Sequence, residues 1–208
     1  MNTLIAQTKN KIALVLIETQ NEWMHPEGKL NKALIKDQSM MKNSISNIEK
    51  VLQFARKNKL TIIHVGLKFT EGYPELGNAT SGLRKAIPNA GTFQENSFGA
   101  TFFESVKPLK NEFITSGRTG ASGFTGTNLD SYLRNNNINK LYIVGYATHV
   151  CVESTFRDAH EKGYNSIVIS DATSAFNNQQ QDYFLSEIVH HFGEHITSEN
   201  FFSLDLTN

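Results

Sequence analysis

Cysteine is almost absent from this 208-residue sequence, in which Cys151 is the sole example. One cysteine cannot form a disulfide within its own chain, so a disulfide scaffold is excluded and a reducing compartment is expected. An excess of charge is missing as well, because 20 Lys and Arg residues balance 20 Asp and Glu residues. A basic excess normally attracts nucleic acid or anionic membranes, so we expect neither of them as a partner.

Long hydrophobic runs are absent too. The longest, residues 12–17, is much too short to cross a membrane, and residues 1–11 lack the apolar core of a signal peptide. We therefore expect a cytoplasmic protein that acts on a small molecule. No repeat or linker divides the sequence, and a chain of this length can bury one sizeable core, so residues 1–208 are predicted to form a single domain.

The sequence does contain short apolar runs rich in β-branched residues, which are typical of strands buried on both faces. These runs are residues 12–17, 61–65, 141–144 and 166–169, with a weaker fifth at 112–115. Apolar residues at helical spacing lie in residues 45–55, 129–137, 152–161 and 183–192. Alternating strands and helices predict an α/β fold, with helices on both faces of a mainly parallel sheet.

Residues 69–110 interrupt this alternation with many glycines and three of the four prolines. We expect this stretch to be an extended, partly irregular excursion from the sheet. Loops of such length usually have a function, so the excursion is predicted to form a lid or an interface.

Three chemically distinct side chains follow predicted strands. Glu18 comes after residues 12–17, Arg118 soon after 112–115, and Cys151 after 141–144. Since the carboxyl ends of parallel strands meet at one edge of a sheet, we expect the three side chains to meet there.

Cys151 is the natural nucleophile of such a group. It is predicted to lie in the first turn of a helix, where the helix dipole lowers the pKa of a thiol. Backbone N–H groups of that turn could hold an oxyanion, Glu18 could accept the thiol proton, and Arg118 could hold the pair in place. The alternative is that Cys151 is a small buried hydrophobe, as free cysteines commonly are.

The same residues resemble the isochorismatase-like cysteine hydrolases over nearly the whole chain. Residues 17–23 (IETQNEW) are similar to the first motif of that family, and residues 145–159 (GYATHVCVESTFRDA) are similar to its nucleophile motif. Residues 122–129 (SGFTGTNL) and 170–172 (SDA) fit the segments between and after. The resemblance implies a three-layer αβα sandwich with a sheet of about six strands.

The resemblance also implies a reaction, namely hydrolysis of small non-peptide C–N bonds of amides, ureas or imides through an acyl-enzyme. The catalytic residues would be Cys151, Glu18 and Arg118, and the backbone N–H groups of Ala147 and Cys151 would form the oxyanion hole. A cis peptide bond is implied between Ala147 and Thr148. The family implies a homodimer or homotetramer, and we expect no cofactor.

Two of the three catalytic positions depart from the family pattern, because Glu18 replaces Asp and Arg118 replaces Lys. Arg and Lys are not interchangeable at a tight site. The sequence therefore also fits a second hypothesis, a catalytically weakened or inactive relative that binds a small carbonyl compound.

Aromatic residues near the predicted site are candidates for a substrate pocket: Trp23, Phe69, Phe124 and Tyr146. No metal is expected. His191 and His195 have the i, i+4 spacing of a helical metal pair, but Gly193 lies between them and no third ligand is evident.

Overall fold

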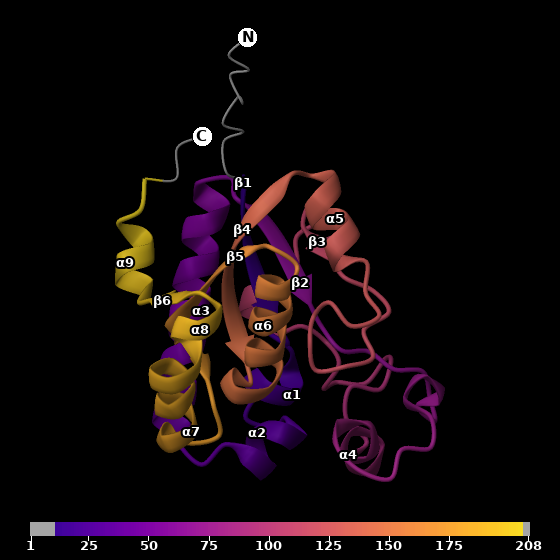
Figure 1. The fold of residues 1–208 in the computed structure, drawn as a ribbon. Helices are drawn as coiled ribbons and strands as arrows, with labels where there is room; N and C mark the ends of the chain where they lie inside the picture. Colours follow the sequence, from indigo (N-terminus) through magenta and orange to yellow (C-terminus); the bar gives the residue numbers. More distant parts are fainter. Residues whose placement is uncertain (1–10, 206–208) are drawn as a thin grey trace.

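A computed structural model describes residues 11–205, in which six strands form one parallel sheet with the order β3-β2-β1-β4-β5-β6 (Figure 1). The strands are β1 (Lys11–Ile17), β2 (Thr61–Val65), β3 (Phe113–Ile114), β4 (Ile138–Tyr146), β5 (Asn165–Ser174) and β6 (Glu194–Ile196). All neighbouring pairs run parallel. The predicted α/β class and parallel sheet are confirmed. Strand β6 was not predicted, because it is short, partly exposed and lacks an apolar run.

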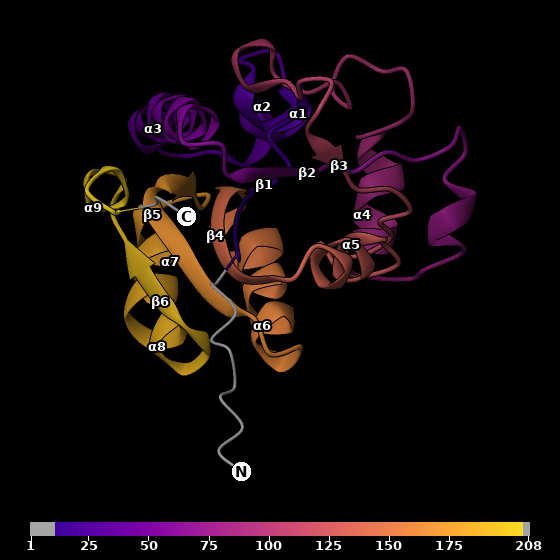
Figure 2. The same cartoon turned by 90° about the horizontal axis from the view of Figure 1, so that it is seen from above.

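Helices cover both faces of this sheet (Figure 2). One face carries α1 (Asn21–Met24), α2 (Lys29–Leu34), α3 (Gln38–Lys57) and α9 (Ser198–Phe202). The other carries α5 (Leu129–Asn135), α6 (Glu153–Glu161), α7 (Asn178–Tyr183) and α8 (Val189–Phe192), with a π-helical turn, Phe184–Ile188, between the last two. In β1, Leu14 and Leu16 enter one hydrophobic core, whereas Ala13, Val15 and Ile17 enter the other. The three-layer αβα arrangement is therefore confirmed.

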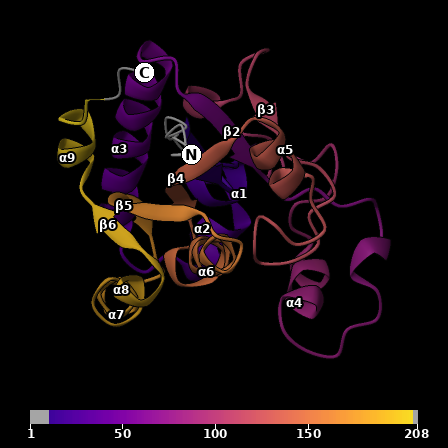
Figure 3. The same ribbon diagram turned by 45° about the horizontal axis from the view of Figure 1, so that its top comes forward.

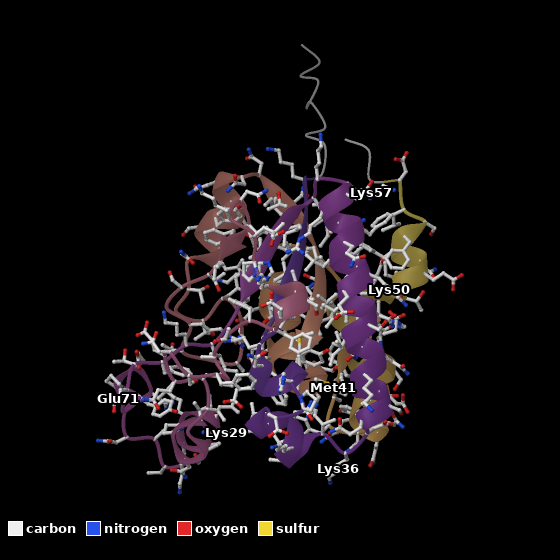
Figure 4. All side chains as sticks on the ribbon, turned by 180° about the vertical axis from the view of Figure 1, so that it is seen from behind. Lys29, Lys36, Met41, Lys50, Lys57 and Glu71 are labelled. Carbon is white, nitrogen blue, oxygen red and sulfur yellow. The ribbon has the colours of Figure 1, made fainter. Side chains whose placement is uncertain are left out.

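Helix α3 shows how local sequence sets an element. The carboxylate of Asp37 caps its first turn by accepting hydrogen bonds from the N–H groups of Ser39 and Met40. The predicted apolar face, which includes Ile48 and Leu52, is buried against the sheet. Lys50 and Lys57 lie along its outer side (Figure 4). This amphipathic pattern fixes which side of α3 faces the core.

The excursion between β2 and β3 contains three short helical segments: the 3₁₀ turns Pro74–Leu76 (η1) and Glu104–Val106 (η2), and helix α4 (Leu83–Ala90). Helix α4 lies beyond the β2–β3 side of the sheet (Figure 3), whereas η2 contacts α3, where the Ser105 hydroxyl donates to Glu49. The side chain of Gln20 ties the excursion to the loop after β1, because Nε2 donates to the carbonyls of Leu67 (2.8 Å) and Ala100 (2.6 Å). Oε1 of Gln20 also accepts from the Leu67 N–H at 2.9 Å. The excursion is thereby held beside the carboxyl ends of the strands.

None of the helices in residues 11–205 combines the length and the apolar character that crossing a membrane requires.

Candidate active site

The site lies where the strand order reverses. From β1 the sheet continues through β2 to β3 on one side and through β4 to β5 on the other, so a crevice opens at the carboxyl ends of β1 and β4. Glu18 directly follows β1, and Cys151 follows β4 in a π-helical turn, Thr148–Val152 (η3). Gly145 makes this approach possible. A side chain there would place its Cβ 1.9 Å from the carbonyl oxygen of Ile17, and the φ of +117° also favours glycine.

Glu18 and Arg118 form a buried ion pair. Glu18 Oε1 lies 2.8 Å from Arg118 Nη2, and each side chain is only 1% exposed. Arg118 Nε also donates to the Gly120 carbonyl at 3.1 Å, and Nη2 donates to the Ala121 carbonyl. Among the described residues, Arg118 is the one ion-pair partner of Glu18 Oε1, and no hydrogen bond of suitable angle reaches this oxygen.

Trp23 fixes the other oxygen of the same carboxylate. Its indole N–H donates to Glu18 Oε2 at 2.7 Å, and both side chains are buried. The backbone of Glu18 is left-handed, with a φ of +50°, and its N–H donates to the Val65 carbonyl at 2.9 Å. The glutamate is one methylene longer than the aspartate of the family pattern, and Trp23 and Arg118 hold it from two sides.

Cys151 lies beside this pair, and both the Glu18 carboxylate and the Arg118 guanidinium are close enough to act on the pKa of its thiol. Burial raises the pKa of the thiol well above its ordinary value, the Glu18 carboxylate raises it further, and Arg118 lowers it by less. The predicted lowering of this pKa is therefore wrong, because desolvation and the nearby carboxylate outweigh the positive charge. The resting thiol is neutral, and its proton is available to Glu18.

The turn that carries Cys151 corrects one detail of the prediction. The cis peptide bond lies between Tyr146 and Ala147, one bond earlier than predicted. The bond between Ala147 and Thr148 instead belongs to the turn, since the Ala147 carbonyl accepts from the N–H groups of Val150 (3.1 Å) and Val152 (3.2 Å). Ala147 directly precedes this turn and Cys151 lies within it, and their oxyanion role stays a prediction.

Two cavities meet at Cys151. The first, of about 250 Å³, also contains Glu18 and Trp23. The second, of about 510 Å³, lies on the side of Thr119, Gly120 and Ala121. Cys151 is 4% exposed and is among the residues that line both cavities.

Of the four predicted pocket aromatics, Trp23 alone lines the cavities at Cys151. Tyr146 is fully buried, and its hydroxyl lies 3.0 Å from that of Ser44. Phe124 stacks on Tyr164, and Phe69 packs beside Tyr73. These three rings lie in the hydrophobic cores and not among the residues that line the two cavities at Cys151, and their role in substrate binding stays a prediction.

Other residues form the walls that the sequence left unassigned. From the excursion come Leu67, Leu83, Ile87, Thr92 and Phe93, and from the loop after β5 comes Phe176. Phe176 follows the carboxyl end of a strand, so the rule that identified Glu18 could have identified it too. The excursion residues had no comparable signal, because their placement depends on long-range contacts such as those of Gln20.

The described residues contain no group of three or more His, Cys, Asp or Glu side chains arranged to hold a metal ion. His191 ends up in α8 and His195 in β6, with Gly193 between them. Their spacing therefore does not place them on one helix face.

Comparisons with known proteins agree with this geometry. The family model for the isochorismatase domain matches residues 12–200. A ureidoacrylate amidohydrolase, RutB, from Agrobacterium fabrum is 31% identical over 175 residues, which cover 79% of this chain and 76% of that protein. The structure of N-carbamoylsarcosine amidase from Thermoplasma acidophilum superposes with a TM-score of 0.71 at 25% identity, covering 91% of this chain and 97% of that one. A cysteine hydrolase from Pseudomonas syringae has a similar fold, with a TM-score of 0.78 at 24% identity and coverage of 92% and 91%.

Proposed function

This chain belongs to the isochorismatase family, and on that premise we propose that it is an amidohydrolase that cleaves small non-peptide C–N bonds through Cys151. The observation that carries the proposal is that Cys151 and Glu18 line one cavity, with Glu18 held by the Arg118 guanidinium at 2.8 Å. Two of its relatives are named for hydrolysis of C–N bonds, the ureidoacrylate amidohydrolase and the N-carbamoylsarcosine amidase. The thiol, the proton acceptor and the cation together supply what attack on an amide carbonyl needs.

In the first half of the reaction, Cys151 Sγ attacks the carbonyl carbon while its proton passes to Glu18 Oε1. The oxyanion that forms is held by the backbone N–H groups of Ala147 and Cys151. Glu18 then returns the proton to the departing nitrogen, the C–N bond breaks, and a thioester remains on Cys151.

In the second half, water attacks the thioester and Glu18 accepts a proton from it. The C–S bond breaks, the carboxylic acid leaves, and the thiol regains its proton. Arg118 transfers no proton in either half, because a guanidinium remains charged. Its fixed charge instead stabilises the Glu18 carboxylate and the thiolate that forms during attack, which makes Glu18 the single proton carrier.

The replacement of Asp and Lys by Glu18 and Arg118 favours the second candidate, a weakened relative that binds a carbonyl compound without turnover. The raised pKa of Cys151 also fits it, because a neutral thiol is a poor nucleophile unless a base takes its proton.

Mass spectrometry distinguishes the two candidates. The protein is incubated with a panel of small amides and ureas, quenched in acid, and examined for an acyl adduct on Cys151 while released ammonia is measured. We expect an adduct and ammonia from the unmodified protein, neither from Cys151→Ala, and both from Ser122→Ala, which removes a buried hydroxyl outside the two cavities. Turnover that survives in Cys151→Ala would contradict the proposal, and binding without turnover would support the second candidate.

A further inference from the structure

The cavity that contains Glu18 and Cys151 has almost entirely apolar walls. Leucine, isoleucine, alanine, valine and phenylalanine side chains from α2, α4, η3 and the loop after β5 form most of its surface. Glu18 is the one charged residue among those that line it. A second negative charge in this cavity would lose its hydration, and no Lys, Arg or His among the described residues lines the cavity to compensate it. The cavity therefore suits an uncharged, apolar group.

Its size suits a group comparable to a benzene ring. A cavity of about 150 Å³ is sufficient for benzene, and this one measures about 250 Å³. Helix α4 forms one wall through Leu83 and Ile87. The position of α4 is fixed at its end by Lys29, whose Nζ donates to the carbonyls of Ala90 (3.2 Å) and Gly91 (2.5 Å). Figure 4 shows Lys29 in this part of the molecule.

Thr92 is the exception in the apolar wall. It is 0% exposed, and its hydroxyl has no hydrogen-bond partner among the described residues. Because none of Thr92 is exposed, its hydroxyl does not face the open space of the cavity and adds no polar surface to the wall.

The second cavity has a different character. It shares Cys151, Leu67, Leu83 and Ile87 with the first, and its remaining walls include polar residues such as Thr119, Thr125 and Arg84. Cys151 therefore lies at the junction of an apolar cavity and a larger, more polar one. An amide placed at this junction would have its two sides in different surroundings.

From these observations we infer that the substrate is a compact, uncharged amide whose apolar acyl group occupies the first cavity. The nitrogen leaves on the side of the second cavity, as ammonia or a small amine. This inference rests on the proposed function, and it distinguishes this chain from a relative named for an acrylate, which is a carboxylate.

Binding can be measured apart from turnover, because the cavity contains the protein's sole tryptophan, Trp23. The fluorescence of Cys151→Ala is titrated with isovaleramide, benzamide and succinamate, the last being similar in size to isovaleramide but carrying a carboxylate. We expect saturable changes with the two neutral amides and at least about tenfold weaker binding of succinamate, the effect of roughly one unfavourable charge contact. Equal or tighter binding of succinamate, or no binding of either neutral amide, would overturn the inference.

Ammonia release from the same compounds separates this inference from the proposed function. Faster hydrolysis of succinamate than of isovaleramide would leave the proposed function standing and overturn the substrate class. If the neutral amides bind more tightly than succinamate but no compound is hydrolysed, the substrate class would stand and the proposed function would be overturned.

Discussion

Replacing Glu18 by glutamine keeps the shape of the side chain and removes one buried charge. The ion pair with Arg118 spans 2.8 Å, and both side chains are 1% exposed. Breaking a buried pair by removing one partner costs about 3–5 kcal/mol, because the remaining charge is left uncompensated. Arg118 keeps its backbone carbonyl partners, so we expect a loss near the lower end, about 3 kcal/mol in the free energy of unfolding.

The same substitution removes the proposed proton carrier. General base catalysis contributes about 10²- to 10⁴-fold, so we expect kcat/KM for amide hydrolysis to fall by that factor in Glu18→Gln. Ammonia release under first-order conditions measures this fall, provided that the variant is folded at the assay temperature.

The reactivity of the Cys151 thiol toward alkylation should rise in Glu18→Gln, whereas the rate of hydrolysis falls. Besides burial, the Glu18 carboxylate raises the pKa of Cys151, whereas Arg118 lowers it. With the carboxylate gone, Arg118 is unopposed, the pKa falls, and alkylation by iodoacetamide at neutral pH becomes faster although hydrolysis is lost. Because the chain has one cysteine, the mass of the whole protein reports this reaction directly.

Glu27→Gln is the matched control, since it makes the same chemical change in an exposed ion pair with Lys32. Exposed pairs contribute at most about 1 kcal/mol, so we expect little change in stability and none in alkylation or hydrolysis. Slower or unchanged alkylation in folded Glu18→Gln would refute the account of the thiol. A stability equal to that of Glu27→Gln would refute the account of the buried pair.

Three further predictions concern the residues around this pair. Trp23→Phe removes the hydrogen bond to Glu18 Oε2, and a bond to a charged group contributes about 1.5–3 kcal/mol, so kcat/KM should fall by about 10- to 100-fold with Cys151 alkylation retained. Arg118→Lys loses the planar donor set that meets the Gly120 and Ala121 carbonyls, so urea unfolding should show a loss of about 1–3 kcal/mol. Burial raises the pKa of Glu112, but hydrogen bonds from Arg56, the Leu109 N–H and His64 lower it to about 2. Ionised Glu112 therefore contributes at most about 3 kcal/mol to the free energy of unfolding above about pH 4.5, and this contribution is lost as pH falls toward 2. Unfolding of the parent protein and of Glu112→Gln, compared across this pH range, should show the loss.

The sheet could be predicted because its strands are short runs of β-branched residues buried on both faces, and the segments between the strands have apolar residues at helical spacing. The runs at 12–17 and 61–65 correspond closely to β1 and β2. Strand β6 escaped prediction because three partly exposed residues leave no periodic signal. Helix α4 escaped because Gly82, Pro88 and Gly91 mark its ends and interior as a loop, and none of its residues is buried.

The meeting of Glu18, Arg118 and Cys151 could be predicted because topology alone brings strand ends together. The direction of the thiol pKa could not, since it depends on how deeply Cys151 is buried and how close the carboxylate lies. The pocket walls were predicted poorly for a related reason. Tyr146 and Phe93 are both buried aromatics, and only the tertiary packing decides which of them faces the cavity.

The central position of β1 has a consequence for biosynthesis. β1 is made first, yet it pairs with β2 on one side and with β4 on the other, and β4 is made only after the whole excursion and α5. Until then the ribosome carries a nascent chain whose first strand, with five side chains that are fully buried in the folded protein, lacks one neighbour. Such exposed apolar edges promote aggregation during synthesis. The active site, built at the seam between β1 and β4, is therefore completed late, and recovery of activity should mark the end of folding.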